Sequence, residues 1–191
     1  GNFDLVALHQ SGFENAVAPL GTAFTAAQAK LIRRFAQRVT LMFDGDAAGR
    51  KAVHAAYPLL RAAELTGRVA RLPPGDDPDT YLRKHGVPGL TRVIDDAIGI
   101  VEYVIDAAAA AAGPDAEARA NAIQSLGPVL MSAGNPVEIE LYIQRIAQRF
   151  ALTDIGVVKE QLRRGVRGVR PTRPGLATSD RSASGNRVAE T

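Results

Sequence analysis

Apolar positions along residues 1–97 alternate between a strand spacing and a helix spacing. Val39–Phe43 is a continuous, β-rich and largely apolar run that stops at Asp44, which is typical of a strand buried on both faces. Ala47–Leu65 then places apolar residues on one helical face, and Arg68–Leu72 returns to a short strand pattern. Because short strands alternate with helices, we predict an α/β fold with a parallel sheet flanked by helices.

Residue types at the predicted helix ends agree with this alternation. Thr25 is followed three residues later by Gln28, the pattern of a capping box at a helix start. Asp77 and Pro78 have the types favoured at the N-cap and at the first helical position, so a second helix should begin there. Gly86 is expected to end it.

From Ile98 onward the strand pattern disappears. Three helical patterns and a short fourth, which Thr153 or Asp154 begins and which ends near Arg164, predict a small all-α bundle. Beyond it, Pro, Gly, Ser and Arg dominate, as in a disordered tail. The three long helical patterns are Ile98–Ala112, Asp115–Ser132 and Pro136–Phe150. We therefore predict a catalytic-type α/β domain over 1–97, a helical subdomain over 98–165 and a disordered basic linker over 166–191.

The composition limits the kinds of metal site and of binding partner that the chain can have. The chain contains no Cys, and its three His are scattered, so thiolate-bound zinc, Fe–S clusters and disulfides are excluded. Any metal must be held by oxygen, which favours Mg²⁺, Mn²⁺ or Ca²⁺. The segment from Arg163 to the end carries a net charge of +5, whereas residues 1–162 carry −2. Residues 1–162 as a whole are therefore not a basic module that coats DNA. No apolar run reaches membrane-spanning length, and a cytoplasmic protein is expected.

Carboxylates gather at the predicted ends of two strands. Asp44 and Asp46 follow the first strand, and Asp76, Asp77 and Asp79 follow the second. In a parallel sheet both groups meet at the same edge, where ligands bind. A purely structural role stays open as the alternative to metal binding. Asp44 and Asp46 also suit a turn followed by a helix N-cap, and Asp77 also suits an N-cap.

The predicted chemistry is metal-assisted phosphoryl or nucleotidyl transfer. Carboxylate oxygens can hold Mg²⁺ together with substrate phosphate oxygens. Gly49 and Arg50 lie at the start of the following helix, whose N–H groups favour an anion such as a phosphate.

Four segments, in order, resemble motifs of the Toprim domain of bacterial DnaG-type DNA primases. Together they cover most of residues 1–86 and are much more specific than any one alone. They are Gly-Asn-Phe-Asp at 1–4 with the apolar run after it, Ala-Val-Ala-Pro-Leu-Gly-Thr-Ala at 16–23, Phe-Asp-Gly-Asp-Ala-Ala-Gly at 43–49, and Leu-Pro-Pro-Gly-Asp-Asp-Pro-Asp at 72–79.

The resemblance implies a Toprim-like fold and a role for each matching residue. Asp44 and Asp46 look like the metal-binding Asp-x-Asp, and Asp4, Asp77 and Asp79 like additional acidic residues around Mg²⁺ or Mn²⁺. Gly21 and Thr22 look like a loop lining the same edge. On this basis Asp44, Asp46 and Asp4 are candidate catalytic residues; Asp44, Asp46, Asp77 and Asp79 are candidate metal ligands; and Gly21, Thr22, Gly49 and Arg50 are candidate nucleotide-binding residues.

The resemblance also implies an activity and partners. DnaG-type primases are DNA-directed RNA polymerases that make short RNA primers on single-stranded DNA from ribonucleoside triphosphates, in the cytoplasmic replisome. Their replicative helicase would be contacted through a C-terminal domain outside this chain. The family's catalytic Glu would precede Gly1, so we expect the chain to be a fragment that is inactive alone.

Other functions remain open on the sequence. The acidic core also occurs in other Toprim enzymes, such as nucleases and topoisomerases, although these lack the Gly21-Thr22-Ala23 loop followed by Asp-Pro-Asp. A haloacid-dehalogenase-type phosphatase also uses a strand-end Asp-x-Asp, but with Thr or Val where this chain has Ala48. A non-enzymatic alternative is a truncated module that binds metal and nucleotide.

Overall fold

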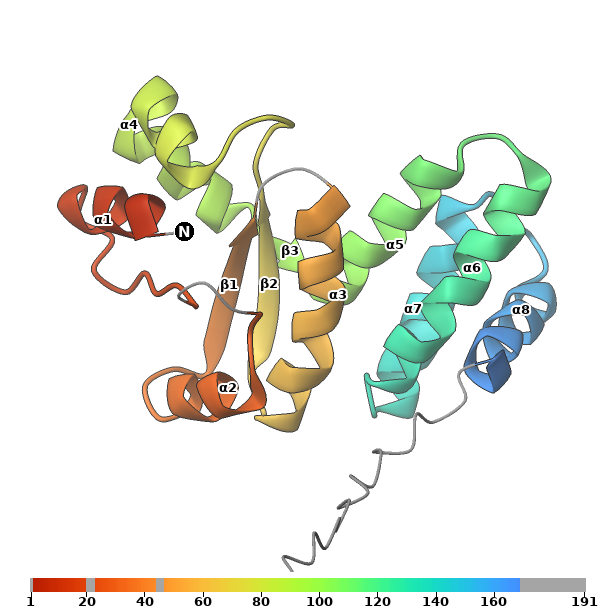
Figure 1. The fold of residues 1–191 in the computed structure, drawn as a ribbon. Helices are drawn as coiled ribbons and strands as arrows, with labels where there is room; N and C mark the ends of the chain where they lie inside the picture. Colours follow the sequence, from red (N-terminus) through yellow and green to blue (C-terminus); the bar gives the residue numbers. More distant parts are fainter. Residues whose placement is uncertain (1, 20–22, 44–46, 169–191) are drawn as a thin grey trace, which may run out of the picture.

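The fold consists of a small sheet, the helices around it and a group of four helices beside it (Figure 1). The computed structural model describes residues 2–19, 23–43 and 47–168. In chain order its elements are α1 (Asn2–Gln10), α2 (Ala26–Arg33), β1 (Arg38–Phe43), α3 (Ala47–Ala62), β2 (Thr66–Arg71), α4 (Pro78–Asp95), β3 (Ile98–Gly99), α5 (Ile100–Ala112), α6 (Ala116–Met131), α7 (Pro136–Arg149) and α8 (Ile155–Gly168).

The central sheet has the order β1-β2-β3 within the described residues. β1 and β2 are parallel, with Arg38 opposite Thr66 and Phe43 opposite Arg71, so the predicted α/β class with parallel strands is confirmed. β3 pairs with β2 in the antiparallel direction, Ile98 lying opposite Val69. The prediction that no strand follows residue 97 is therefore wrong. A two-residue strand depends on the neighbouring strand's hydrogen bonds and leaves no periodic pattern in the sequence.

α3 ends earlier than its pattern suggested. The helix stops at Ala62, Glu64 adopts a positive φ of 57°, and the chain enters β2 at Thr66. Gly67, just past the predicted end of the helix at Leu65, lies inside β2. A Cβ at that position would lie 2.3 Å from Cδ1 of Ile100, so a larger residue there would have to displace the Ile100 side chain of α5.

The predicted caps are confirmed. The Thr25 side chain accepts a hydrogen bond from the Gln28 amide while the Gln28 side chain bonds the Thr25 amide, a complete capping box. Asp77 caps α4 as predicted. Gly86 breaks the helix with φ 65°, but helical turns resume at once and continue to Asp95.

The start of the chain is helical. α1 covers Asn2–Gln10, including the apolar run that follows Asp4 in the sequence. Its residues Ala7 and Leu8 pack on a small core of Leu72, Leu82 and Leu90, so tertiary packing stabilises the helix.

The predicted helical bundle is present as α5–α8 (Figure 1). Its main core includes Phe150, Ile146 and Leu126, and the same cluster of buried residues continues into the sheet side through Val69 and Leu60. The predicted boundary at 97/98 therefore crosses a shared core. α8 extends to Gly168, beyond its predicted end near Arg164. None of the helices among the described residues is both long and apolar enough to cross a membrane.

Candidate functional site

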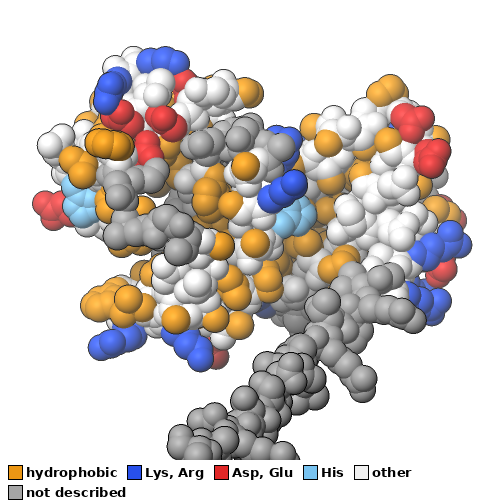
Figure 2. Space-filling view, viewed as in Figure 1, with side chains coloured by type: hydrophobic (Ala, Val, Ile, Leu, Met, Phe, Trp, Pro, Cys, Tyr) orange, Lys and Arg blue, Asp and Glu red, His pale blue; other side chains and the backbone are white. Residues whose placement is uncertain are grey.

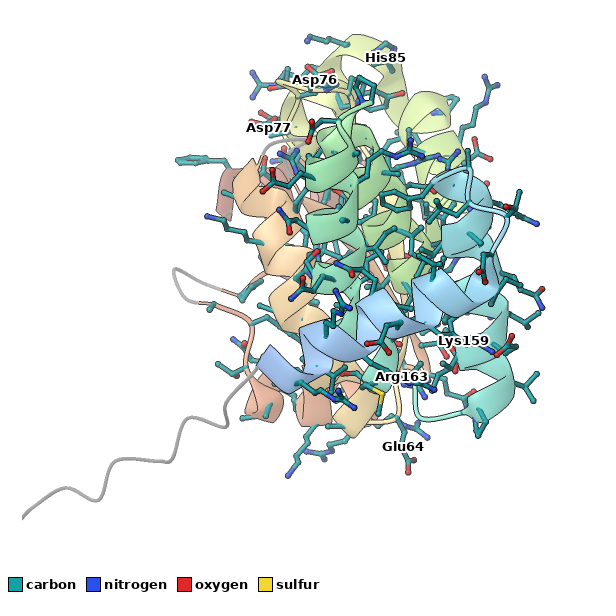
Figure 3. All side chains as sticks on the ribbon, turned by 90° about the vertical axis from the view of Figure 1, so that its right-hand side faces the viewer. Glu64, Asp76, Asp77, His85, Lys159 and Arg163 are labelled. Carbon is teal, nitrogen blue, oxygen red and sulfur yellow. The ribbon has the colours of Figure 1, made fainter. Side chains whose placement is uncertain are left out.

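The parallel pairing of β1 and β2 brings their carboxyl ends to one edge of the sheet. Phe43 and Arg71, the last residues of the two strands, are direct neighbours in the register. Asp76 and Asp77 lie together at this end of the molecule, opposite Glu64 (Figure 3). The predicted residues Gly21, Thr22, Asp44 and Asp46 lie outside the described residues.

Asp76 is the buried acidic residue of this edge. It is 7% exposed, and its Oδ1 lies 2.5 Å from Nζ of Lys84 on α4. The ion pair compensates the carboxylate for lost hydration. The carboxylate of Asp76 is therefore already paired with Lys84.

Asp77 is a helix cap in this structure. Its Oδ1 accepts a hydrogen bond of 2.6 Å from the Thr80 amide. Hydrogen bonding from the Thr80 amide lowers the pKa of the Asp77 carboxyl below its usual value. The structural alternative that the sequence left open for Asp77 is thus realised, and the carboxylate is held in its charged form.

Asp79 forms a two-point contact with Arg83, one helical turn further along α4. Nη2 of Arg83 lies 2.5 Å from Oδ2 and its Nε donates to Oδ1 at 3.1 Å. The side chain of Asp79 is 17% exposed, whereas that of Arg83 is 77% exposed. Arg83 therefore holds the carboxylate from the solvent side.

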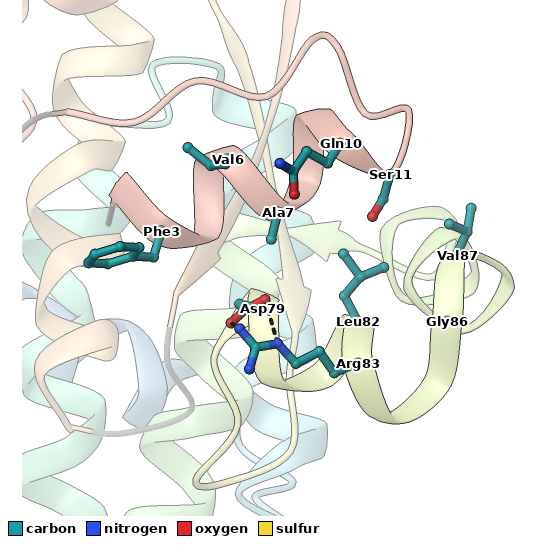
Figure 4. Close-up of a pocket in the computed structure, with 10 residues that line it drawn as sticks. All are labelled: Phe3, Val6, Ala7, Gln10, Ser11, Asp79, Leu82, Arg83, Gly86 and Val87. Atoms are coloured by element: carbon teal, nitrogen blue, oxygen red, sulfur yellow. Dashed lines mark hydrogen bonds and ion pairs between the residues drawn. The ribbon is translucent and has the colours of Figure 1, made fainter.

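A pocket of about 460 Å³ lies between α1 and α4, next to the Asp79–Arg83 pair (Figure 4). Phe3, Val6 and Leu82 give it an apolar lining, and Asp79 with Arg83 forms its charged wall. Asp4 lies in the first turn of α1, the helix that contributes Phe3 and Val6 to the pocket. The sequence reasoning missed the pocket and the cations Arg83 and Lys84; the Asp79–Arg83 spacing of four residues in a helix was the available signal.

The described carboxylates do not by themselves form a metal site. Among residues 2–19, 23–43 and 47–168, no three or more His, Asp or Glu side chains are grouped so that they could hold a metal ion. The donor chemistry is nevertheless suitable, because every candidate ligand is a carboxylate and Mg²⁺ prefers oxygen.

The start of α3 lies at the same edge. The helix begins at Ala47, directly after the acidic motif, and its axis runs away from the carboxyl end of β1 (Figure 1). Gly49 is buried and Arg50 is half-buried. The N-terminus of a helix carries a partial positive charge, so this position suits a phosphate.

A second polar cluster joins α3 to α7. The Tyr142 hydroxyl donates to Glu138 at 3.1 Å, and Glu138 lies 3.9 Å from Arg61. Burial, with the nearby Glu138, raises the pKa of Tyr142. Tyr142 is half-buried. This cluster fixes the helical group against α3.

Comparisons with known proteins match both parts of the chain. Residues 1–82 match a family model described as Toprim-like, and residues 101–154 match one described as the DnaB-helicase binding domain of primase. The DNA primase of Clostridium acetobutylicum is 33% identical over 155 residues, which is 81% of this chain and 26% of that protein.

Solved primase structures share the fold. A DNA primase domain from Pseudomonas aeruginosa superposes with a TM-score of 0.66 at 30% identity, covering 85% of this chain and 52% of that one. The chain belongs to the bacterial DnaG-type DNA primases. A DnaG primase catalytic domain solved with bound single-stranded DNA superposes with a TM-score of 0.63 at 28% identity, covering 82% of this chain and 50% of that one.

The chain spans about a quarter of the Clostridium primase and about half of the solved primase domains. The Toprim-like match contains all the predicted site residues, from Asp4 to Asp79. Membership of the primase family was thus predicted correctly from the four sequence motifs.

Proposed function

We propose that this chain supplies the nucleotidyl-transfer centre of a DNA primase, which makes short RNA primers on single-stranded DNA from ribonucleoside triphosphates. The observation that carries the proposal is that a Toprim-like match and a primase-specific match follow one another on a fold shared with primase catalytic domains. The single-stranded DNA bound to one of those relatives supports the template.

In this proposal the carboxyl edge of the sheet holds Mg²⁺ or Mn²⁺ through Asp44 and Asp46. Such a metal ion polarises the phosphate under attack and favours the attacking hydroxyl in its ionised form. Asp4, with Asp44 and Asp46, provides catalytic carboxylates, and Asp77 and Asp79 are additional metal ligands.

Nucleotide phosphates are assigned to the Gly21-Thr22 loop and to the start of α3. Gly49 is buried. Because it has no side chain, the backbone of α3 can approach a phosphate closely at this position. Arg50 supplies a cation one helical turn after Asp46.

A chimeric enzyme tests the proposal. Residues 1–168 replace the matching segment of the Clostridium primase, and templated RNA synthesis is measured on single-stranded DNA with Mg²⁺. We expect primers from the chimera and a loss of at least about 100-fold with Asp44→Asn and Asp46→Asn combined. The double variant Asp95→Asn/Asp96→Asn changes charge equally on an exposed part of α4 and should retain activity. A folded chimera without primer synthesis contradicts the proposal.

The same assay separates the alternatives. A Toprim nuclease or topoisomerase would cleave or relax DNA without incorporating ribonucleotides, and a metal-binding module would do neither.

A second proposal concerns the helicase. We propose that the helical group α5–α7 takes part in binding a DnaB-type helicase, as the description of the model matching residues 101–154 supports. This position lies inside the chain, whereas the sequence reasoning assigned helicase contact to a domain outside it. Val137 and Leu141 on α7 are 69% and 60% exposed, so they provide a testable apolar surface.

The test measures binding of immobilised helicase by the whole chain. The double variant Val137→Ala/Leu141→Ala should weaken binding at least about fivefold, whereas Leu31→Ala on α2 should not. Equal binding by both variants would exclude this face of α7.

A further inference from the structure

The end of α2 and the start of β1 form an exposed surface that combines cations with apolar side chains. Phe35 is 80% exposed and Leu31 is 52% exposed. We call this the α2 surface; its exposed members are Lys30, Leu31, Arg33, Arg34, Phe35 and Arg38. Figure 2 shows hydrophobic and Lys or Arg side chains gathered at this lower end of the molecule.

The α2 surface is strongly basic. Between Glu14 and Asp44 the sequence contains four basic residues and no acidic one. The fold brings Glu64 towards the same end, because Thr66 pairs with Arg38 and its amide bonds the Gln37 carbonyl. Glu64, two residues before β2, is therefore a carboxylate at the same end of the sheet as the four cations.

The aromatic ring follows a helix that is anchored at its start and in its middle. The guanidinium of Arg34 lies 5.9 Å from the centre of the Phe35 ring, within cation–π range. The capping box fixes the start of α2, and fully buried Ala29 anchors its middle. The exposed ring therefore stands at the end of an anchored helix, where a flat ligand can reach it.

We propose that the α2 surface binds single-stranded DNA, with Phe35 stacking on an unpaired base and Arg34 and its neighbours contacting phosphates. Exposed aromatics among cations are the means by which proteins hold single strands without sequence preference. A duplex hides its base faces, so it would use only the cations. The choice of DNA rests on the proposed function, in which the template is single-stranded DNA.

This surface is separate from the candidate metal site. Arg38 and Phe43 are the two ends of β1, which at about 3.3 Å per residue places them roughly 17 Å apart. Glu64 and Asp76 lie at opposite ends of the molecule in Figure 3. Single-stranded DNA bound to this surface would therefore contact the chain at a second place, away from the nucleotidyl-transfer centre.

Fluorescence anisotropy with labelled oligo-dT tests the proposal on the whole chain, with a chelator and no nucleotides present. Phe35→Ala should weaken binding at least about fivefold, and Phe35→Trp should restore it. Arg34→Ala should lower the slope of log affinity against log salt by about 0.7, the loss of one phosphate contact. Phe35 is exposed, so folding should be unaffected, and circular dichroism confirms this.

Val157→Ala and Arg163→Ala are matched controls, because both residues are exposed on the helical group. Their binding should equal that of the unaltered chain. Unchanged affinity in Phe35→Ala overturns the proposal, as does a change in self-association without a change in DNA binding. Because metal and nucleotides are absent, failure here leaves the primer-synthesis proposal standing, and failure of primer synthesis leaves this result interpretable.

Discussion

The ammonium group of Lys84 lies 2.5 Å from the carboxylate of Asp76, the buried acidic residue at the carboxyl edge of the sheet. The pair ties the loop after β2 to the middle of α4. It also places a cation of the chain beside the acidic groups assigned to metal and nucleotide.

Replacing Lys84 by Met should destabilise the fold, because Asp76 stays buried without its partner. We expect a loss of about 1 to 2 kcal/mol in the free energy of unfolding, less than for a fully buried pair because Lys84 is half-exposed. Urea denaturation measures it. The matched change Lys51→Met, at an exposed position of α3, should have little effect, and equal stability of both variants would contradict the importance of the pair.

Two substitutions at Asp77 distinguish its role as a helix cap from a role as a metal ligand. Asp77→Ala removes the cap and should cost about 1 kcal/mol, whereas Asp77→Asn loses the charge but keeps a capping oxygen and should cost less. If Asp77 is also a metal ligand, Asp77→Asn should still weaken Mn²⁺ binding. A stability loss in Asn as large as in Ala would mean that the charge, not the cap, stabilises α4.

The pKa of Asp77 also predicts a pH dependence. Its folded-state pKa lies below the reference value of 3.8, so its contribution to stability is fully present above that value. The contribution is lost as the pH falls through the lower folded-state pKa. The difference in stability between the unaltered chain and Asp77→Ala should therefore shrink below about pH 4, as thermal unfolding measured across pH can show.

Tyr57 and Tyr142 should respond differently to the same change. The Tyr57 hydroxyl is buried and has no hydrogen-bond partner among the described residues, whereas the Tyr142 hydroxyl donates to Glu138. Tyr57→Phe should be neutral or stabilise by up to about 1 kcal/mol, and Tyr142→Phe should cost about 1 kcal/mol. The reverse order in thermal unfolding would contradict these assignments.

Close packing of α6 against α8 predicts intolerance at Gly165. A Cβ there would lie 1.8 Å from the carbonyl oxygen of Gln124, which the backbone cannot relieve without moving a helix. Gly165→Ala should therefore destabilise by about 1 to 3 kcal/mol or more. Gly99→Ala is the control, because its Cβ would meet only Glu102 Oε2 at 3.7 Å. Equal stability of the two variants would contradict the close helix contact.

Elements with local signals were predictable from the sequence. The run Val39–Phe43 identified β1, Thr25 with Gln28 identified the start of α2, and Asp77 identified the start of α4. β3 was not predictable, because its two residues are a strand only through pairing with β2. The helical state of α1 likewise depends on packing against Leu82 and its neighbours.

The candidate site was predictable as a set of acidic residues, but not as a set of contacts. The sequence placed Asp76, Asp77 and Asp79 at the correct edge. It did not show that Lys84, the Thr80 amide and Arg83 each engage one of them, because these contacts depend on side-chain geometry along α4.

Binding of Mn²⁺ to the chain tests the central claim, a metal centre at the carboxyl edge of the sheet, most directly. Titration of the unaltered chain is compared with Asp44→Asn/Asp46→Asn and with the charge-matched control Asp95→Asn/Asp96→Asn. We predict that the first double variant loses at least roughly tenfold in affinity, as expected when ligands are removed, while the control binds normally. Equal Mn²⁺ affinity in all three proteins would contradict the assignment of Asp44 and Asp46 as metal ligands.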